Sequence, residues 1–425
     1  MNIVILRLFR DKYQDYSKKE KVNMSTILRN KHWINRLPHI YEIDDLIAFC
    51  KKNKRIYIYG RGEAQEWLVR FLDMCGIVNV EGYVVSFYPD ENNFCYRKLP
   101  VKLIDDIINQ PDVGIVLALC DRYHGEIIPM FREKGFENWI SLTEHTRLGI
   151  AEQMAPRNKD EMTFEISLAD HCNLSCQMCD HFSQLSDPWF VDVEQFKKDI
   201  RRMAEIYDHE IGAISLLGGE PTLHPHLNEL IEFVRMQFPE TELILLTNGV
   251  LLTSLENSSQ GNLWETLKKN HVHVTVTVYP IKLDYMAIEK KAAEYGVSLK
   301  LSSDIHAVEA TKQTKISDKH TMDLEGRVPK EHCVHCLYFN KFNVVKDGRY
   351  YMCPVQAHIN IFNNKFEKNL LYTESDYLDI YEVNDWHEFA EYSSKWVPFC
   401  RFCDQKNWKH ESVWKNSNKS IEEYI

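Results

Sequence analysis

The sequence predicts an α/β protein with several domains, and three observations support this prediction. The chain has 425 residues, which exceeds the size that a single hydrophobic core usually serves. Two stretches alternate apolar strands with amphipathic helices, a pattern typical of parallel sheets. Residues 331–425 then carry five cysteines and few apolar runs, so a metal centre would stabilise this part more easily than its own core.

These observations divide the chain into four predicted parts. They are an N-terminal helical extension (1–45), a first α/β domain (46–155), a second α/β domain (156–325) and a cysteine-rich subdomain (326–425). A polar stretch from Ser302 to about Lys330 shows no periodicity, which suits either a mobile cover over a site or a plain linker.

The first α/β domain has the pattern of a small Rossmann-like parallel sheet, with predicted strands that begin at Arg55 and cover 78–86, 113–119 and 137–142. Gly60 and Gly62 in the first turn would let the backbone approach a phosphate. However, Gln65 replaces the third glycine of a dinucleotide motif, and Ser86 stands where an acid is expected. A scaffold or docking role and a nucleotide or nucleotide-sugar site therefore both stay open.

The second α/β domain is predicted to form a βα-repeat sheet, open or barrel-like. Two amphipathic helices are expected over 193–207 and 226–238. In such a sheet the loops at the C-terminal strand ends are free to carry chemistry. The predicted strands are Phe164–Leu168, Ile211–Leu217, Leu243–Thr247, His273–Tyr279 and Val297–Leu301.

Composition and cysteine spacing indicate the expected location of the protein and the classes of partner that it is expected to lack. With 44% hydrophobic residues and a net charge of -11, the chain is expected to be globular, without a general affinity for nucleic acid. The apolar start MNIVILRLF is too short for a membrane span, so no membrane partner and a cytoplasmic location are expected. Most of the twelve cysteines lie in CxxC-type clusters, which in a reduced compartment indicate metal. Cys50, Cys75, Cys95 and Cys120 lack such spacing and are interpreted as ordinary thiols.

The strongest chemical motif follows the first strand of the second domain. Cys172, Cys176 and Cys179 form C-x3-C-x2-C within DHCNLSCQMCD, which places three thiolates on one loop at the sheet's C-terminal edge. A closed zinc site or an ordinary iron–sulfur ligand set takes four donors. The triplet therefore leaves one coordination position for something other than a cysteine.

Further motifs follow in a fixed order. Gly218, Gly219 and Glu220 end the next strand, and the LLTNG segment closes the one after it. Thr277 lies in the following strand, and Met178 immediately precedes the third cysteine. With these motifs the sequence resembles the radical SAM (S-adenosylmethionine) enzymes from about residue 164 to residue 301.

The resemblance implies a partial (β/α)6-type radical SAM barrel and a set of cofactors. Cys172, Cys176 and Cys179 would hold a 4Fe-4S cluster, whose fourth iron binds the amino and carboxylate groups of S-adenosyl-L-methionine. The Gly-Gly-Glu segment would hold the amino group, the Met178 backbone would meet the adenine, and Thr277 would contact the ribose or carboxylate. A thiolate-bound cluster can be reducing enough to cleave the sulfonium into a 5'-deoxyadenosyl radical. A flavodoxin- or ferredoxin-type electron donor is implied.

A second cysteine group lies downstream. Cys336, Gly348 and Cys353 fit C-x11-G-x4-C, and Cys400 and Cys403 give a later C-x2-C. This is similar to the twitch and SPASM subdomains, which bind auxiliary 4Fe-4S clusters, and the cysteine number favours the one-cluster twitch form.

Two questions stay open for this second group: which cysteines are the ligands, and whether they hold a cluster or zinc. The expected ligands are Cys336, Cys353, Cys400 and Cys403, a complete set suited to electron transfer. Cys333 is a spare that could replace one of them, and a structural zinc site is the alternative to a cluster. The nearby histidines are interpreted as bystanders: His332, His335 and His358.

An auxiliary cluster beside a radical site offers an acceptor for one electron. The resemblance therefore implies oxidation of a small molecule, either a carbohydrate or a nucleotide-linked substrate such as a nucleotide sugar. A peptide-modifying maturase or an epimerase is the alternative, and a zinc-binding interaction module is the alternative from another class. No residue is assigned as the catalytic base.

Overall fold

We describe a computed structural model of the chain. It describes residues 41–86, 99–107, 110–119, 123–143, 146–147, 149–150, 154, 158–257, 261–311, 318–329, 336, 338–339, 342–410 and 413–425. Several predictions lie outside these residues. They concern most of the helical extension and the side chains of Cys95, Cys120, His332, Cys333 and His335.

The first α/β domain forms a five-stranded parallel sheet in the order β3-β2-β1-β4-β5, an order that doubly wound folds commonly use. Its apolar centre includes Tyr59, Ile115 and Phe131. The Gln65 amide donates to the backbone oxygen of Ala118, so it ties the first turn of α4 to the residue that follows β4. The elements are α3 (Tyr41–Lys52), β1 (Arg55–Tyr59), α4 (Glu63–Met74), β2 (Val80–Val85), β3 (Val101–Leu103), β4 (Val113–Leu117), α5 (His124–Glu133) and β5 (Trp139–Ser141).

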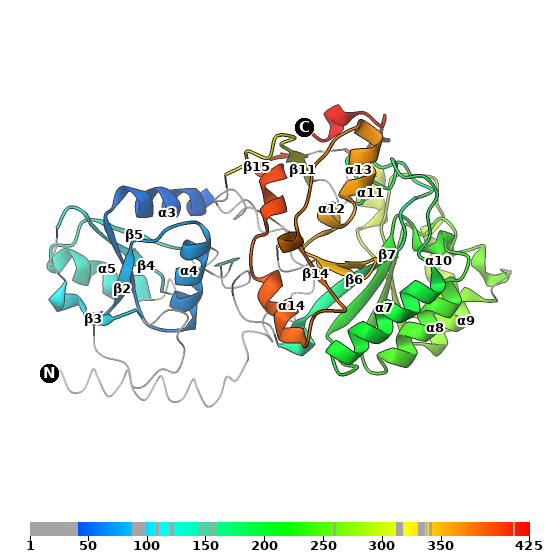
Figure 1. Ribbon diagram of the computed structural model, residues 1–425, viewed down its shortest axis with the longest axis horizontal. Coiled ribbons are helices and arrows are strands. Elements are labelled where there is room, and N and C mark those ends of the chain that lie inside the picture. The colour runs from blue at the N-terminus through cyan, green and yellow to red at the C-terminus, as the bar shows by residue number, and fades with distance from the viewer. Residues whose placement is uncertain are drawn as a thin grey trace. The chain divides into compact units, whose positions relative to one another are not determined.

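The second domain is a parallel sheet with helices on its outer face, and each predicted strand overlaps an observed one. Figure 1 shows α7, α8 and α9 side by side along this sheet. The strands are β6 (Thr163–Ala169), β7 (Ala213–Gly218), β8 (Glu242–Thr247), β9 (Val272–Val276) and β10 (Leu299–Leu301). The helices are α7 (Val193–Ile206), α8 (Leu227–Gln237), α9 (Leu263–Lys269), α10 (Tyr285–Tyr295) and α11 (Ile305–Thr311).

Helix α7 shows why these residues form the outer layer. The Asp192 carboxylate caps its first turn by accepting from the backbone N–H groups of Glu194 and Gln195. Phe196, Ile200 and other apolar residues at helical spacing are buried against the sheet. Strand β6 contributes Phe164 to the same layer, where its ring meets those of Tyr207 and Phe238.

The cysteine-rich part extends this sheet. Strand β12 pairs in parallel with β6, and a tight turn then leads to β13. β14 pairs antiparallel with β13 after two intervening helices, which gives eight strands in the order β10-β9-β8-β7-β6-β12-β13-β14. Strand β11 pairs antiparallel with β15, so a segment before residue 325 joins one beyond residue 400. The elements are β11 (Asp318–Met322), β12 (Val344–Lys346), β13 (Arg349–Tyr351), α12 (Pro354–Ala357), α13 (Ile359–Phe366), β14 (Tyr377–Asp379), α14 (Trp386–Ser393) and β15 (Cys403–His410).

Short 3-10 turns connect several of these elements. They are Ile104–Asp106, Lys159–Glu161, Pro221–Leu223, Leu255–Asn257, Glu374–Asp376, Pro398–Phe402 and Ile421–Glu423.

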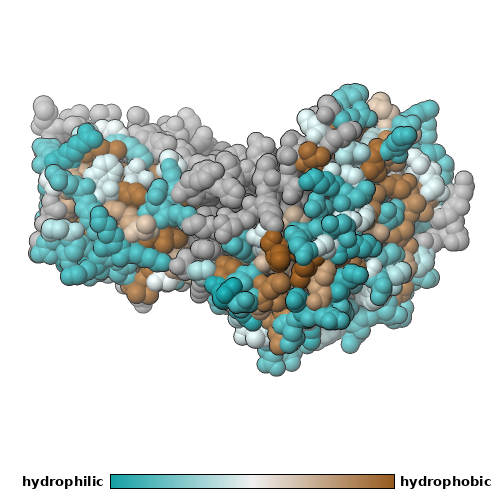
Figure 2. Space-filling model, turned by 90° about the horizontal axis from the view of Figure 1, so that it is seen from above, coloured by the Kyte–Doolittle hydropathy of each residue, from teal (hydrophilic) through white to brown (hydrophobic). Residues whose placement is uncertain are grey.

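The described surface mixes polar and apolar residues. Figure 2 shows apolar patches among hydrophilic residues on the face seen from above. Individual exposed apolar side chains include Val78, Met236 and Met286. No helix in the described part of the chain is both long enough and apolar enough to cross a membrane.

Candidate metal centres

The cysteine triplet lies on the loop that leaves the C-terminal end of β6. The Cys172 sulfur accepts from the Leu174 backbone N–H at 3.3 Å and from the Asn248 side-chain amide at 3.6 Å. Burial raises the pKa of the Cys172 thiol to about 12, and the charges of Glu220, Cys179 and Cys176 act in the same direction. The three sulfurs are thus close enough to repel one another as thiolates, a repulsion that a bound cationic centre would relieve.

The third cysteine has a polar neighbourhood of its own. Cys179, Asp180 and His181 place one ligand atom each within 4.8 Å of one another. Burial opposes ionisation of Cys179, but the hydrogen bond with His181 lowers the pKa of its thiol. Met178, predicted to meet a cofactor through its backbone, is buried and has a left-handed conformation with φ of 53°. This turn brings the third cysteine back toward the first two.

The two glycines at the end of β7, Gly218 within the strand and Gly219 just after it, cross the backbone at the start of the cysteine loop. A Cβ atom on Gly218 would lie 2.3 Å from the Ala169 oxygen, and one on Gly219 would lie 2.0 Å from the His171 oxygen. The Gly219 N–H donates to the Ala169 oxygen at 2.6 Å. No residue with a side chain fits this crossing, which explains the glycine pair.

The acid of the same motif joins two strand ends. Glu220 is fully buried, and its Oε1 accepts from the Thr222 N–H at 3.1 Å and from the Thr247 hydroxyl at 2.6 Å. Its Oε2 accepts from the Asn248 N–H at 2.8 Å. Burial raises the pKa of Glu220, while these hydrogen bonds lower it. The carboxylate therefore holds the LLTNG segment against the Gly-Gly-Glu turn.

Strand β9 brings Thr277, which was predicted to contact the cofactor, to the same edge of the sheet. Thr277 is buried, and its N–H donates to the Thr247 oxygen at 2.9 Å. Tyr279 follows it, and burial together with the charges of all three cysteines raises the pKa of its phenol well above the usual value. The ends of β6, β7, β8 and β9 thus meet around the triplet, as predicted for the loops of a βα-repeat sheet.

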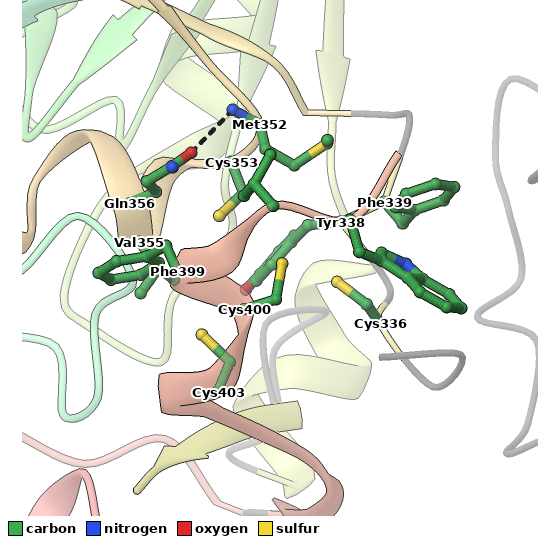
Figure 3. A pocket seen from close by; sticks show the side chains of 12 residues that line it. Cys336, Tyr338, Phe339, Met352, Cys353, Val355, Gln356, Phe399, Cys400 and Cys403 are labelled. Carbon is green, nitrogen blue, oxygen red and sulfur yellow. Dashed lines mark hydrogen bonds between the residues drawn. The ribbon is translucent and has the colours of Figure 1, made fainter. Parts of the chain in front are cut away.

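The four downstream cysteines line a pocket. We name it the second pocket because it belongs to the second cysteine group. Cys336, Cys353, Cys400 and Cys403 face the same space in Figure 3. Cys353 precedes α12, Cys400 lies in the 3-10 turn Pro398–Phe402, and Cys403 begins β15. Burial raises the pKa of Cys353 and Cys403 well above the usual value, and the neighbouring thiolates raise it further. Three segments of the chain, around Cys336, Cys353 and residues 400–403, therefore place four thiols around one cavity.

The sulfurs in both groups are spread widely. Among the described residues, the one set of three or more potential ligand atoms within 4.8 Å of each other is Cys179, Asp180 and His181. No three of the four downstream sulfurs are therefore that close. A tetrahedral zinc ion with Zn–S bonds of about 2.3 Å needs sulfurs only about 4 Å apart.

A chain of partly buried polar groups lies between the two cysteine groups. The Tyr338 hydroxyl, in the wall of the second pocket, donates to Asp180 Oδ2 at 2.7 Å. Hydrogen bonds with Asp180 and Cys179 outweigh the effect of burial and raise the pKa of His181 well above its usual value. A single hydrogen bond thus joins the residue after Cys179 to the wall of the second pocket.

His358, interpreted from sequence as a bystander, holds the second group against β6. Its Nδ1–H donates to the Pro354 oxygen at 2.8 Å, which leaves Nε2 to accept from the Ser167 hydroxyl at 2.9 Å. Burial and the charges of His181 and Lys346 lower its pKa well below the usual value, so the ring is neutral. This fully buried ring fixes the segment that follows Cys353.

A buried ion pair anchors the start of the cysteine loop. Lys346 on β12 pairs with Asp170, and its ammonium lies 4.0 Å from the centre of the Trp189 ring. Sequence alone gives no sign of this pair because β12 and the cysteine loop are far apart in the chain. Asp170 does lie inside the quoted cysteine motif and His181 follows it two residues after Cys179, so their proximity to the site could have been inferred.

Comparison with known proteins identifies the central segment. Residues 166–292 match the model of the Radical SAM superfamily. The antilisterial bacteriocin subtilosin biosynthesis protein AlbA of Bacillus subtilis (strain 168) is 34% identical over 90 residues, which are 21% of this chain and 18% of that protein. A GTP 3',8-cyclase of Clostridium perfringens (strain SM101 / Type A) is 28% identical over 151 residues, which are 33% of this chain and 45% of that protein.

A solved structure, BtrN in complex with AdoMet and 2-DOIA, aligns with 62% of this chain and 96% of its own, at 16% identity and a TM-score of 0.36. The chain spans less than half the length of the two curated relatives, 18% of one and 45% of the other. The superfamily match supports an iron–sulfur enzyme with radical chemistry. Through residues 166–292, the chain is therefore similar to the Radical SAM superfamily.

Proposed function

We propose that the chain reductively cleaves S-adenosyl-L-methionine and oxidises a small sugar-like or nucleotide-linked substrate. The observation that carries this proposal is the pair of thiol sites, one with three cysteines and one with four. The three-thiol site lies at the strand ends beside the Gly-Gly-Glu turn, where a cluster would retain one iron for a cofactor. The four-thiol site offers a closed ligand set.

The residues around the triplet fit the proposed cofactor. Donors reach the Cys172 sulfur from Leu174 and Asn248, as sulfurs of a bound cluster require. When bound, the cluster and S-adenosyl-L-methionine supply a 5'-deoxyadenosyl radical that abstracts hydrogen. In our proposal, Met178 offers its backbone to the adenine and Thr277 contacts the ribose or carboxylate. Gly218 and Gly219, through their backbone, and the Glu220 carboxylate receive the amino group.

The second pocket fits an auxiliary cluster better than zinc. Its sulfurs are too dispersed for one small tetrahedral ion, while a cubane spreads its ligands over four metal atoms. All four cysteines are needed to close such a set, which leaves the pocket without an open position for substrate. We therefore propose an electron-accepting role for this site, which matches a net oxidation of the substrate.

The proposed substrate class depends on two features of the chain. The parallel sheet of the first domain and the twitch-like cysteine pattern favour a carbohydrate or nucleotide-linked molecule. One relative acts on a nucleotide by its name, and another is named for bacteriocin biosynthesis, which favours a peptide. Peptide modification is therefore our second candidate.

A metal assay separates these proposals from the zinc alternative. Protein purified without oxygen is assayed for iron, acid-labile sulfide and zinc. About eight irons per chain support two clusters, whereas about four irons with zinc support a structural zinc site. Zinc without iron would remove the enzyme proposal.

The substrate is then identified by label transfer. Candidate nucleotide sugars and candidate peptides, each deuterated at a carbon that could react, are incubated with the reduced protein and S-adenosyl-L-methionine. Deuterium in 5'-deoxyadenosine identifies both the substrate and the carbon attacked. Transfer from a peptide and not from any sugar would overturn the carbohydrate proposal in favour of the second candidate.

A further inference from the structure

The last described segment, residues 413–425, lies across the cysteine loop, and we name it the strap. Its backbone pairs with the loop on both sides of Cys176. The Gln177 N–H donates to the Lys415 oxygen at 3.0 Å, and the Ser417 N–H donates to the Ser175 oxygen at 2.8 Å. Cys176 and Asn416 form an isolated antiparallel bridge between them. The strap therefore holds the middle cysteine as a neighbouring strand would.

The far end of the strap holds the other side of the loop. Tyr424 is buried, and its ring lies 5.3 Å from that of Phe182, three residues beyond Cys179. Its hydroxyl also bonds with the Gln184 amide, and its backbone oxygen accepts from the Met322 N–H at 2.6 Å. The strap is thus fixed at two points that bracket Cys176 and Cys179.

One strap side chain reaches a thiol directly. The Trp414 indole Nε1–H donates to the Cys176 sulfur at 3.3 Å. Its ring lies 5.8 Å from that of Tyr279, which follows β9 at the same edge. An indole N–H can only donate, so its partner in the native protein is an electron-rich acceptor, which a metal-bound thiolate provides.

We propose that the strap is a built-in clamp for the cysteine loop and that Trp414 is a positioning residue that tunes the cluster bound by the triplet. This inference depends on the proposed function, because it assumes that Cys172, Cys176 and Cys179 hold a cluster. Hydrogen bonds to cluster sulfurs and solvent exposure both set the reduction potential. A donor at Cys176 stabilises the more negative reduced state, and the paired strap limits the access of water.

The test compares Trp414→Phe with Trp386→Phe in the full chain. Trp386 is the matched control because its ring stacks on exposed His387 at 4.0 Å, without a thiol partner. The measurement is the midpoint potential of the cluster whose electron paramagnetic resonance spectrum changes when S-adenosyl-L-methionine is added. Trp414→Phe is expected to shift this potential to a more negative value, and Trp386→Phe is expected to match wild type.

A second pair of variants tests the clamp without changing the indole. Ser417→Pro removes the N–H that bonds to Ser175, whereas Ser417→Ala keeps it. Ser417→Pro is expected to release iron to a chelator several-fold faster than Ser417→Ala.

The outcomes separate the two proposals. Wild-type protein without a cluster that responds to S-adenosyl-L-methionine would remove the proposed function, and this inference with it. A responsive wild-type cluster with equal potentials in both tryptophan variants would overturn the role of Trp414. Equal iron release from both Ser417 variants would overturn the clamp.

Discussion

Gly219 lies where the Gly-Gly-Glu turn crosses the backbone that leads to Cys172. Its Cα comes so close to this backbone that a methyl group would overlap the His171 oxygen at 2.0 Å. Since the contact is with backbone and not with a flexible side chain, relief requires one of the two chain segments to move. A single atom at this position therefore decides whether the turn and the cysteine loop can approach.

Gly219→Ala is expected to destabilise the protein by about 1–3 kcal/mol, the usual cost of forced overpacking. It is also expected to reduce the iron bound per chain because the cysteine loop must shift. Gly125→Ala in α5 is the control, since an added Cβ there meets nothing within 4 Å. Denaturant unfolding of both variants measures the difference, and equal midpoints would contradict the steric argument.

Glu165 on β6 is a partly buried acid with an unusual environment. Strand alternation points it away from the Phe164 layer, toward His181 and Asp180. Burial raises its pKa to about 7, while the His181 charge lowers it and the Asp180 charge raises it. Since the folded state prefers the protonated form, this group stabilises the fold at low pH, and that contribution is lost as the pH rises through about 7.

Glu165→Gln is therefore expected to be more stable than wild type at pH 8 and close to wild type below pH 5. The upper bound for this gain is about 3 kcal/mol, since each pKa unit corresponds to about 1.4 kcal/mol. Glu210→Gln, at an exposed position, should follow wild type across the same pH range. The measurement is the free energy of unfolding of each protein as a function of pH. If this free energy changed in parallel for Glu165→Gln and wild type between pH 5 and pH 8, burial of this acid would have no cost.

At the level of helices and strands, sequence periodicity predicted the long elements well. The five strands of the second domain and helix α7 lie within a few residues of their predicted bounds, because each buries one regular face. β3 and β12, with three residues each, were not predicted. The pairing of β12 with β6 depends on contacts between residues nearly 180 positions apart, which local pattern cannot reveal.

The N-cap of α7 gives a test at this scale. Asp192→Ala removes the acceptor for the Glu194 and Gln195 N–H groups, and a loss of about 1 kcal/mol in unfolding free energy is expected. Asp192→Asn is the matched control, because its side-chain oxygen can still cap the helix. If both variants lose the same stability, charge and not the capping hydrogen bonds would be what Asp192 contributes.

Across the whole molecule, the sequence identified the thiols but not what links them. CxxC-type spacing is a local signal, so both cysteine groups could be predicted before the structure was known. The structure adds the Tyr338 bond to Asp180, the His358 bridge from Pro354 to Ser167, and the strap over Cys176. Each of these joins residues far apart in the chain. The result is that the two thiol sites share one polar framework.

The two sites share this framework but no cysteine, so mutations can remove one set of thiols and leave the other in place. The double variant Cys400→Ala, Cys403→Ala removes two of the four thiols of the second pocket and leaves the triplet intact. If the second site accepts electrons, this variant is expected to keep about half of the iron and to form 5'-deoxyadenosine without converting substrate. The triple variant Cys172→Ala, Cys176→Ala, Cys179→Ala is expected to form no 5'-deoxyadenosine. Chromatography of both nucleoside and substrate products measures the two activities, and full substrate conversion by the double variant would exclude an electron-accepting second site.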